Sequence, residues 1–444
     1  MNDLKIIETF PSDFVFGVAT SSYQIEGNSY GGSGTCHWDD FAKIPGSIIN
    51  KENGSIACAH YLKYKEDIAL IADAVFSAYR FSFSWPRILP DGKGSINSKA
   101  ISFYDNLLDE MLQKGLKPFG TLYHWDLPSI FGKNGGWKNR DTTKWFADYT
   151  DIVMRKFSDR LYSVATINEP WCVAWLSHYL GEHAPGERNA ASGVQTMHMI
   201  LVAHAEALQV IRANNFNNAG IVLNKQFVSP HDETENSLLS ASLSDEIHNL
   251  WFDEAIFKGS YPNQTLELFE RFMPQNYEKD LQLISQPIDW VGVNYYTRSI
   301  IKPDKANPFL GFSSTKGNLP TTDMGWEIYP QGLEYIVKRL HESYSKEIPI
   351  FITENGMANQ DFIEDGIIND FSRIKYYYEH LKKVKNLVES DVPVKGYFAW
   401  SLLDNFEWAF GYKKRFGLVH VDFNTLKRTP KNSYYAFQKA LNAR

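Results

Sequence analysis

The sequence is poor in features that several classes of protein require. Its three cysteines, Cys36, Cys58 and Cys172, form no Cys-x-x-Cys pair, so a disulfide framework and a thiolate zinc site are both unexpected. The net charge of -7 argues against nucleic-acid binding, which requires a basic face. No apolar run approaches the roughly 20 residues that span a bilayer, and residues 1–10 lack a basic or apolar leader. We therefore expect a cytoplasmic protein without a nucleic-acid or membrane partner; the sequence indicates no oligomeric state.

Motifs for phosphate, metal and serine chemistry are also missing. There is no P-loop, no serine nucleophile elbow and no paired-histidine motif. His198 and His204 lie six residues apart in a helical segment, a spacing that does not place them on one face, so we assign both to packing. We predict no metal and no organic cofactor.

The chain instead contains eight short runs rich in β-branched and aromatic residues, which predict eight strands. They lie at 14–20, 78–84, 117–124, 163–169, 219–226, 289–296, 349–354 and 394–401. Helical patterns lie between them at 58–74, 99–114, 143–157, 193–214, 241–258, 331–345 and 372–387, and a last one covers 431–442. Such alternation is typical of a parallel sheet with crossover helices.

We interpret this alternation as a closed (β/α)₈ TIM barrel with long βα loops, a single catalytic domain over residues 1–444. The alternative is an open doubly wound sheet. That fold would favour a glycine-rich phosphate turn after the first strand, and no G-x-G-x-x-G motif lies there. Two stretches, 26–57 and 302–325, are rich in turn-forming residues and are predicted to be long βα loops, the second at the active face.

Two of the eight strands end in glutamate. Glu169 lies in ATINEP (165–170) and Glu354 in IFITENG (350–356), so each carboxylate follows a buried strand. A single strand-end glutamate is about as often an ion-pair partner as a catalytic group. Two of them, each beside an asparagine, favour catalysis. Strands four and seven should face each other across the barrel, where carboxylates about 5 Å apart would cleave a glycosidic bond with retention of configuration.

Polar and aromatic residues near other strand ends could serve these carboxylates. Arg80 is predicted to point into the barrel and hold a nearby carboxylate ionised, with a structural salt bridge as the alternative. Tyr296 ends strand six and could donate a hydrogen bond to the same carboxylate, or could be a core tyrosine. Glu407 and Trp408 follow strand eight; a carboxylate accepts two sugar hydroxyls and an indole stacks or donates, although an isolated Glu407 would be read as a solvated loop residue.

Gln24 and His124 end strands one and three. A side-chain amide can both donate to and accept from adjacent hydroxyls. A lone histidine in such a run is more often a core residue than a ligand. Neither residue indicates a sugar site by itself, but their shared position at carboxyl ends of strands does.

With these residues in place, the chain resembles glycoside hydrolase family 1, the family of retaining β-glucosidases, over about residues 10–440. FVFGVATSSYQIEG (14–27) is similar to the family's N-terminal signature, TINEP (166–170) to its acid/base motif and ITENG (352–356) to its nucleophile motif. The three motifs stand in the family's order and at the expected strands. The resemblance implies a TIM barrel that acts without a cofactor.

The resemblance also implies a role for each candidate. Glu169 matches the general acid/base and Glu354 the nucleophile. The nucleophile environment comprises Arg80, Asn294 and Tyr296. The implied substrate-binding residues are Gln24, His124, Asn168, Tyr296, Trp326, Trp400, Glu407 and Trp408. Among them, Asn168 is expected to hold the 2-hydroxyl, and Trp326 to form a wall of the aglycone site.

The activity implied is a retaining β-glycosidase, first of all a β-glucosidase that hydrolyses terminal non-reducing β-D-glucosyl residues by double displacement. Its partner would be a small β-glycoside such as an imported cellobiose-like disaccharide from cellulose degradation or an aryl glucoside. Fucosides and galactosides are expected side substrates. Members that act on thioglucosides carry glutamine at the acid/base position, and this chain has Glu169, so ordinary O-glycosides are expected.

Three alternatives stay open. A 6-phospho-β-glucosidase would replace the Glu407–Trp408 pair with small residues, and an anionic Glu407 would repel a 6-phosphate. A non-catalytic sugar-binding barrel would keep the sugar-holding residues and could lose a catalytic glutamate, but both glutamates are present. A transglycosylase uses the same residues and the same intermediate, so the sequence does not separate it from a hydrolase.

Overall fold

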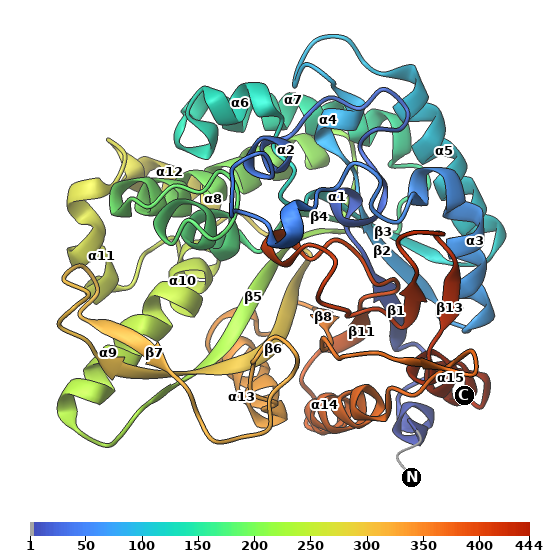
Figure 1. The fold of residues 1–444 in the computed structure, drawn as a ribbon. Coiled ribbons are helices and arrows are strands. Elements are labelled where there is room, and N and C mark those ends of the chain that lie inside the picture. Colours follow the sequence, from blue (N-terminus) through green and yellow to red (C-terminus); the bar gives the residue numbers. More distant parts are fainter. Residues whose placement is uncertain (1–3) are drawn as a thin grey trace.

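The computed structural model describes residues 4–444, and eight parallel strands form a closed ring at its centre (Figure 1). Neighbours around the ring are β1, β2, β3, β4, β5, β6, β8 and β11, and β11 pairs back with β1. Their bounds are Val15–Ala19, Ala78–Ser82, Lys117–Tyr123, Ser163–Asn168, Ala219–Pro230, Trp290–Pro303, Ile350–Asn355 and Val394–Trp400. The predicted (β/α)₈ barrel is confirmed.

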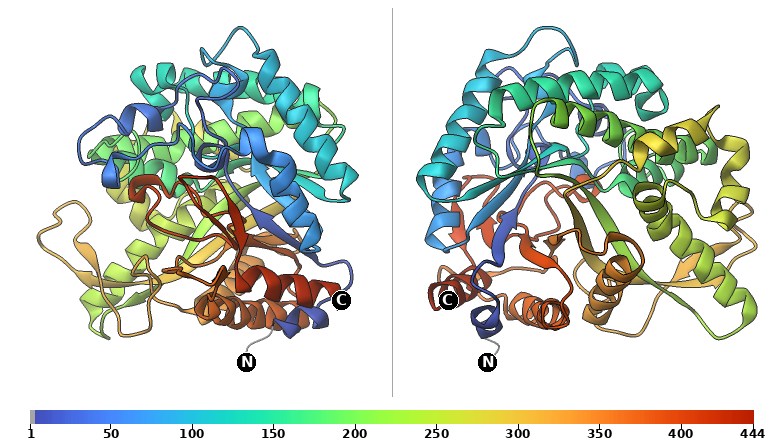
Figure 2. Two further views of the ribbon diagram at one scale, coloured as in Figure 1. Left: turned by 45° about the vertical axis from the view of Figure 1, so that its right-hand side comes forward. Right: turned by 180° about the vertical axis from the view of Figure 1, so that it is seen from behind.

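Helices follow the strands and surround them on the outside (Figure 2). The helices that cross from one barrel strand to the next, or follow the last strand, are α3 (His60–Asp73), α5 (Ser98–Gln113), α7 (Arg140–Phe157), α8 (Ala190–Ala213), α9 (Glu235–Asp245), α10 (Trp251–Lys258), α11 (Asn263–Phe269), α12 (Tyr277–Ile284), α13 (Pro330–Leu340), α14 (Phe371–Glu389) and α15 (Asn432–Asn442). Shorter helices lie in the loops: α1 (Ser22–Ile25), α2 (His37–Phe41), α4 (Trp85–Ile88) and α6 (Ser129–Lys133). None of the helices described is long and apolar enough to cross a membrane.

Three of these helices begin at an asparagine that caps them. The side-chain oxygens of Asn97, Asn139 and Asn189 accept hydrogen bonds from backbone N–H groups of the first turns of α5, α7 and α8. An asparagine at this position satisfies an N–H that has no partner within the helix, which fixes where the helix starts.

The strands are buried on both faces, as expected for a parallel sheet covered by helices. Side chains on one face pack against the helices in the large outer core. A second, separate cluster fills the interior of the ring; it includes Phe119, Val222, Trp290, Phe351 and Phe398. The inner cluster closes the barrel below the carboxyl ends of the strands, so polar side chains are left to gather above it.

Several elements differ from the sequence-based prediction. β5 and β6 continue past the ring as a paired ribbon, and β7 (Phe312–Thr315) adds an antiparallel strand to β6 within the stretch 302–325 that was predicted to be a loop (Figure 1). The predicted helix 241–258 is instead α9, a π-helical turn (Glu246–Leu250) and α10. Two small hairpins, β9–β10 (Ile363–Glu364, Ile367–Ile368) and β12–β13 (Val419–Val421, Arg428–Pro430), were not predicted.

Candidate active site

A cavity of about 310 Å³ opens at the carboxyl ends of the barrel strands. Residues that the sequence analysis singled out form much of its wall: His124, Glu169, Asn294, Tyr296, Trp326, Glu354, Trp400, Glu407 and Trp408. The remaining three, Gln24, Arg80 and Asn168, are buried behind this wall and hydrogen-bond to residues that line it. The structure therefore brings all twelve predicted residues to one place.

The two strand-end glutamates belong to β4 and β8, which lie three positions apart around the ring. The prediction that these two strands face each other directly is wrong, because only β5 and β6 lie between them on one side of the ring. Glu169 and Glu354 are both almost completely buried. The charge of Glu354 is one cause of the raised pKa of Glu169, which places the two carboxyl groups within electrostatic reach.

Glu354 is held by Arg80 and Tyr296, and Asn294 also hydrogen-bonds to it. Nη1 of Arg80 lies 2.6 Å from its Oε1, and the hydroxyl of Tyr296 donates to its Oε2 at 2.7 Å. Burial raises the pKa of Glu354, while the Arg80 cation and the Tyr296 hydroxyl oppose that rise by stabilising the anion. The predicted contacts of Arg80 and Tyr296 with one carboxylate are therefore present.

Glu169 has no such cation against it. Nδ2 of Asn294 donates to its Oε1 at 2.6 Å. Burial first, and then the charge of Glu354, raise the pKa of Glu169 to about 8. Since the pair shares a buried site and only Glu354 touches a guanidinium, the proton resides on Glu169 at neutral pH.

Asn294 contacts both glutamates. The resemblance placed it in the surroundings of Glu354, where its side chain makes a hydrogen bond that lowers the pKa of that carboxyl group, and its Nδ2 also donates to Oε1 of Glu169. The same amide nitrogen donates to Oδ1 of Asn168 at 3.1 Å. Asn294 lies on β6, which stands in the ring between β8, the strand of Glu354, and β5, the neighbour of β4. The Asn294 side chain is therefore close to both glutamates.

Aromatic rings form one side of the cavity. The imidazole of His124 lies roughly parallel to the indoles of Trp400 and Trp408, with centroids 5.8 and 6.1 Å away. The rings of Trp125 and His183 also pack against Trp408, and neither residue was predicted. Trp125 directly follows His124 in the sequence, so its place after strand three was a usable signal; His183 lies in a loop with no such signal.

Glu407 contacts the end of the first strand. Nε2 of Gln24 lies 3.4 Å from Oε2 of Glu407 and 3.0 Å from the oxygens of Asn405 and Phe406. Burial, followed by the charges of Glu354 and Glu169, raises the pKa of Glu407 to about 8. Glu407 is therefore largely protonated at neutral pH, and the predicted repulsion of a 6-phosphate by an anionic Glu407 is weaker than the sequence suggested.

Three residues of this region have left-handed backbones. The φ angles of Trp125, Glu169 and Trp408 are 74°, 52° and 48°. Bulky side chains rarely adopt this conformation, which costs on the order of 1–2 kcal/mol per residue. At Glu169 this conformation occurs directly after β4, and the residue lines the cavity.

The other wall of the cavity contains residues that the sequence analysis missed. Asn224, Lys225 and Gln226 follow the barrel portion of β5, and the rings of Trp171 and His248 lie tilted to each other with centroids 4.2 Å apart. The first three stand at the end of predicted strand five, so their position was a signal. His248 lies within a segment predicted to be a helix and carried none.

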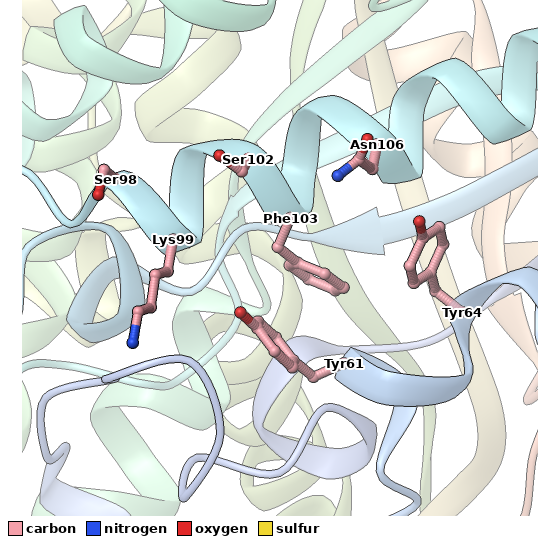
Figure 3. A pocket seen from close by; sticks show the side chains of 7 residues that line it. All are labelled: Tyr61, Tyr64, Ser98, Lys99, Ser102, Phe103 and Asn106. Carbon is pink, nitrogen blue, oxygen red and sulfur yellow. The ribbon is translucent and has the colours of Figure 1, made fainter.

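A second hollow of about 290 Å³ lies between α3 and α5 (Figure 3). Tyr61, Tyr64 and Phe103 form its apolar part, and Ser102 and Asn106 are among the polar residues on α5 that border it. No carboxyl group is among its lining residues. It therefore lacks the paired acids on which the chemistry of the barrel cavity depends.

The histidines assigned to packing have separate protein partners. His198 contacts the hydroxyl of Tyr261 and a carboxylate oxygen of Asp280, and Nδ1 of His204 contacts Thr166. Across residues 4–444, no three His, Cys, Asp or Glu side chains converge to hold a metal ion. The three cysteines are buried and unpaired.

Comparison with known proteins gives full-length matches. The family model described as "Glycosyl hydrolase family 1" matches residues 6–444. The chain is 43% identical over 439 residues to a 1,4-beta-D-glucan glucohydrolase of Thermotoga neapolitana, covering 98% of both proteins. It is 45% identical over 434 residues to a beta-glucosidase of Agrobacterium sp., covering 96% of this chain and 93% of the relative. The solved family 1 b-glucosidase of Thermotoga maritima in complex with isofagomine lactam matches with a TM-score of 0.94 at 42% identity, over 98% of both chains.

Proposed function

The chain belongs to glycosyl hydrolase family 1, and we propose that it is a retaining β-glucosidase that releases terminal non-reducing β-D-glucosyl residues. One observation carries this proposal. Two buried carboxyl groups share the cavity, but Glu354 contacts the Arg80 cation and the Tyr296 hydroxyl, while the side chains that hydrogen-bond to Glu169, Asn294 and Cys172, include no cation. Unequal surroundings of this kind give one ionised and one protonated carboxyl group, which is the pair that double displacement requires.

The mechanism follows from this inequality. An Oε atom of Glu354 attacks the anomeric carbon while the proton of Glu169 moves to the leaving glycosidic oxygen. The first product is an alcohol or phenol, and the sugar stays bound to Glu354 as an ester. Glu169, now ionised, takes a proton from water, and the water oxygen attacks the anomeric carbon. Glu354 departs as the carboxylate, and Glu169 has regained its proton.

Asn168 is well placed to hold a sugar hydroxyl. Its Oδ1 accepts from Nη2 of Arg80 at 2.7 Å and from Asn294, so its amide nitrogen is the end left for a ligand. That nitrogen lies 3.1 Å from Nε2 of His124, and Nδ1 of His124 is buried without a protein partner. A glucosyl unit with its ring against Trp400 and its hydroxyls toward Gln24, His124 and Glu407 would supply the missing contacts.

Charges in the cavity favour a neutral sugar over a 6-phosphosugar. Lys225 is the one lysine or arginine among the described lining residues, and its Nζ is bound 2.5 Å from Asp253 and 3.0 Å from the carbonyl of Asn249. A bound phosphate dianion would have no uncommitted cation in this wall. The carboxylate of Glu354, which lines the same cavity, would repel it.

The relatives narrow the substrate class. The Thermotoga neapolitana relative is named for β-1,4-glucan and the Agrobacterium relative for β-glucoside. We infer that cello-oligosaccharides released in cellulose degradation are substrates of this chain, which acts as one catalytic domain. Its three unpaired, buried thiols suit a reducing compartment, and we propose a cytoplasmic location.

Initial rates on p-nitrophenyl β-glucoside and on its 6-phosphate, with Glu354→Ala as the control, test the proposal. Turnover of the free glucoside, lost in the variant, is the expected result, with β-glucose as the first product seen by proton NMR. Turnover of the phosphate alone would refute the assignment of Glu407. Failure on both, and then on fucoside, galactoside and cellobiose, would favour a non-catalytic sugar-binding barrel.

A further inference from the structure

Thr353, the residue before Glu354, donates its hydroxyl hydrogen to Oδ1 of Asn294 at 2.7 Å. Both side chains are fully buried. Thr353 does not line the cavity, and the mechanism above gives it no part. Its hydrogen bond nevertheless joins the strand of one glutamate to the amide that holds the other.

The donor and acceptor roles in this series of hydrogen bonds are fixed by Arg80, whose guanidinium can only donate. Arg80 donates through Nη2 to Asn168, so the atom it meets must be the amide oxygen. That oxygen also accepts from Asn294, so the end of Asn294 that faces it must be the NH₂ group. The same NH₂ group donates to Oε1 of Glu169, and the oxygen of Asn294 is left to accept from Thr353.

Close packing of β8 against β6 keeps Thr353 within hydrogen-bonding distance of Asn294. A Cβ atom at Gly292 would come within 2.7 Å of Oγ1 and 2.8 Å of Cγ2 of Thr353, so only glycine lets β6 lie this near. The register between β6 and β8 also shifts between Val293 and Asn294. Irregularities of this kind redirect side chains next to active sites. Here the shift allows both Thr353 and Glu354 to face the end of β6.

We propose that Thr353 is a positioning residue for Glu169: its hydroxyl fixes the amide of Asn294 so that the NH₂ group, and not the carbonyl, faces Glu169 and Asn168. This inference rests on the proposed function. Without the hydroxyl, Oδ1 of Asn294 is a buried acceptor with no donor, and the amide orientation that presents NH₂ to Glu169 loses that support. Glu169 then loses an N–H donor and can instead meet a carbonyl.

The effect on Glu169 has a definite sign. An N–H donor stabilises the ionised carboxylate, whereas a carbonyl oxygen stabilises the protonated acid. The titratable and charged groups that otherwise face Glu169 come from five different segments and are Arg80, Cys172, Tyr296, Glu354 and Glu407. Replacement of Thr353 by valine changes the charge of none of these groups. Loss of the hydroxyl therefore raises the pKa of Glu169. The second step, in which Glu169 must be ionised, is slowed as a result.

Thr353→Val and Thr353→Ser form a matched pair, because valine keeps the shape of threonine and serine keeps its hydroxyl. The readout is the pH profile of kcat on 2,4-dinitrophenyl β-glucoside, whose good leaving group makes the second step limiting. We expect the acidic limb of Thr353→Val to move to higher pH by about one unit, the size of one lost hydrogen bond to a charged group. Thr353→Ser should keep the wild-type profile.

An unchanged profile in Thr353→Val, or equal shifts in both variants, would overturn the proposal. In an Asn294→Ala background, Thr353→Val should add nothing, because the residue acts only through that amide; an additive shift would also overturn it. If the Thr353→Val variant does not fold, Thr353→Ala is used in its place. Inactive wild-type protein refutes the proposed function, whereas active wild type with an unshifted variant refutes only the role of Thr353.

Discussion

Arg80 donates from Nη1 to Glu354 at 2.6 Å, and within residues 4–444 no arginine or lysine forms an ion pair with Glu169. The second nitrogen of the same guanidinium reaches Asn168, the residue next to Glu169, but stops at its side-chain oxygen. A single cation that contacts one glutamate and not the other therefore gives the two carboxyl groups different electrostatic surroundings. The chemical difference between them follows from which one the cation touches.

Replacement of Glu169 by alanine should depend strongly on the leaving group. Without its proton donor, the first step slows by about 10²–10⁴-fold for alkyl glucosides and cellobiose. A dinitrophenyl leaving group needs little protonation, so its glycosylation rate should change far less. Pre-steady-state and steady-state rates on both substrates check this. Equal losses on the two would contradict the assignment of Glu169 as the acid.

The alkaline limb of the pH profile should report Glu169. Burial and the charge of Glu354 raise its pKa to about 8, so kcat/KM on cellobiose should fall above about pH 8 as the acid loses its proton. Removing the charge of Glu354 should lower that pKa. In Glu354→Gln, which is expected to be inactive, a carbon-13 NMR titration of Glu169 should give a midpoint below the wild-type value. A midpoint at or above the wild-type value would show that Glu354 does not raise it.

Glu407 should make the folded protein less stable as the pH rises. Its folded pKa is about 8 against an ordinary 4.5, so the native state keeps a proton that the unfolded chain releases between these values. The free energy of unfolding therefore falls with rising pH across this window. Glu407→Gln is neutral throughout and should reduce that fall by roughly 1–3 kcal/mol between pH 5 and pH 8.

Urea unfolding at the two pH values measures this difference. Glu233→Gln is the matched control, because Glu233 is an exposed glutamate on the surface. The control should leave the pH dependence unchanged. A Glu407→Gln variant with the full wild-type fall in stability would show that Glu407 is already ionised at pH 5 in the folded protein.

The left-handed backbone of Glu169 makes glycine the better replacement for stability. Glycine adopts a φ of 52° without the steric cost that any Cβ incurs, so Glu169→Gly should be more stable than Glu169→Ala by about 1 kcal/mol. Thermal unfolding of the two inactive variants compares them directly. At Glu110, inside α5, the order should reverse because glycine weakens a helix. Alanine at least as stable as glycine at position 169 would contradict the argument.

Much of the barrel was readable from local patterns, and the departures have physical causes. All eight ring strands were predicted because a strand buried on both faces leaves a short apolar run. The ribbon of β5 and β6 was not, because Val228, Ser229 and Pro230 are paired only through distant Ser299, Ile300 and Ile301. β7, a Phe-Ser-Ser-Thr segment, is likewise a strand only because β6 offers an edge at Ile300–Pro303.

The candidate site was likewise predicted where local sequence position indicated a residue, and missed where its contacts depend on distant residues. Gln24, His124 and the two glutamates stand at strand ends, so position alone indicated them. The contact of Asn294 with Glu169 could not be deduced in this way, because it joins residues 125 positions apart in the sequence. The protonation of Glu407 was also hidden, since it depends on burial among residues distant in the sequence.

The pairing of β11 with β1 has a consequence for synthesis on the ribosome. Gln24 emerges early, but its partner Glu407 is 383 residues further along. Until Val394–Trp400 has been made, β1 has no neighbour on one side, and the nascent sheet presents an open edge that can pair with other chains. The strand that closes the barrel also delivers Trp400 and, just beyond it, Glu407. With Trp400 and Glu407 holding the sugar as proposed, only a chain whose ring has closed binds glucose, so the glucose-binding fraction measures how many chains have folded completely.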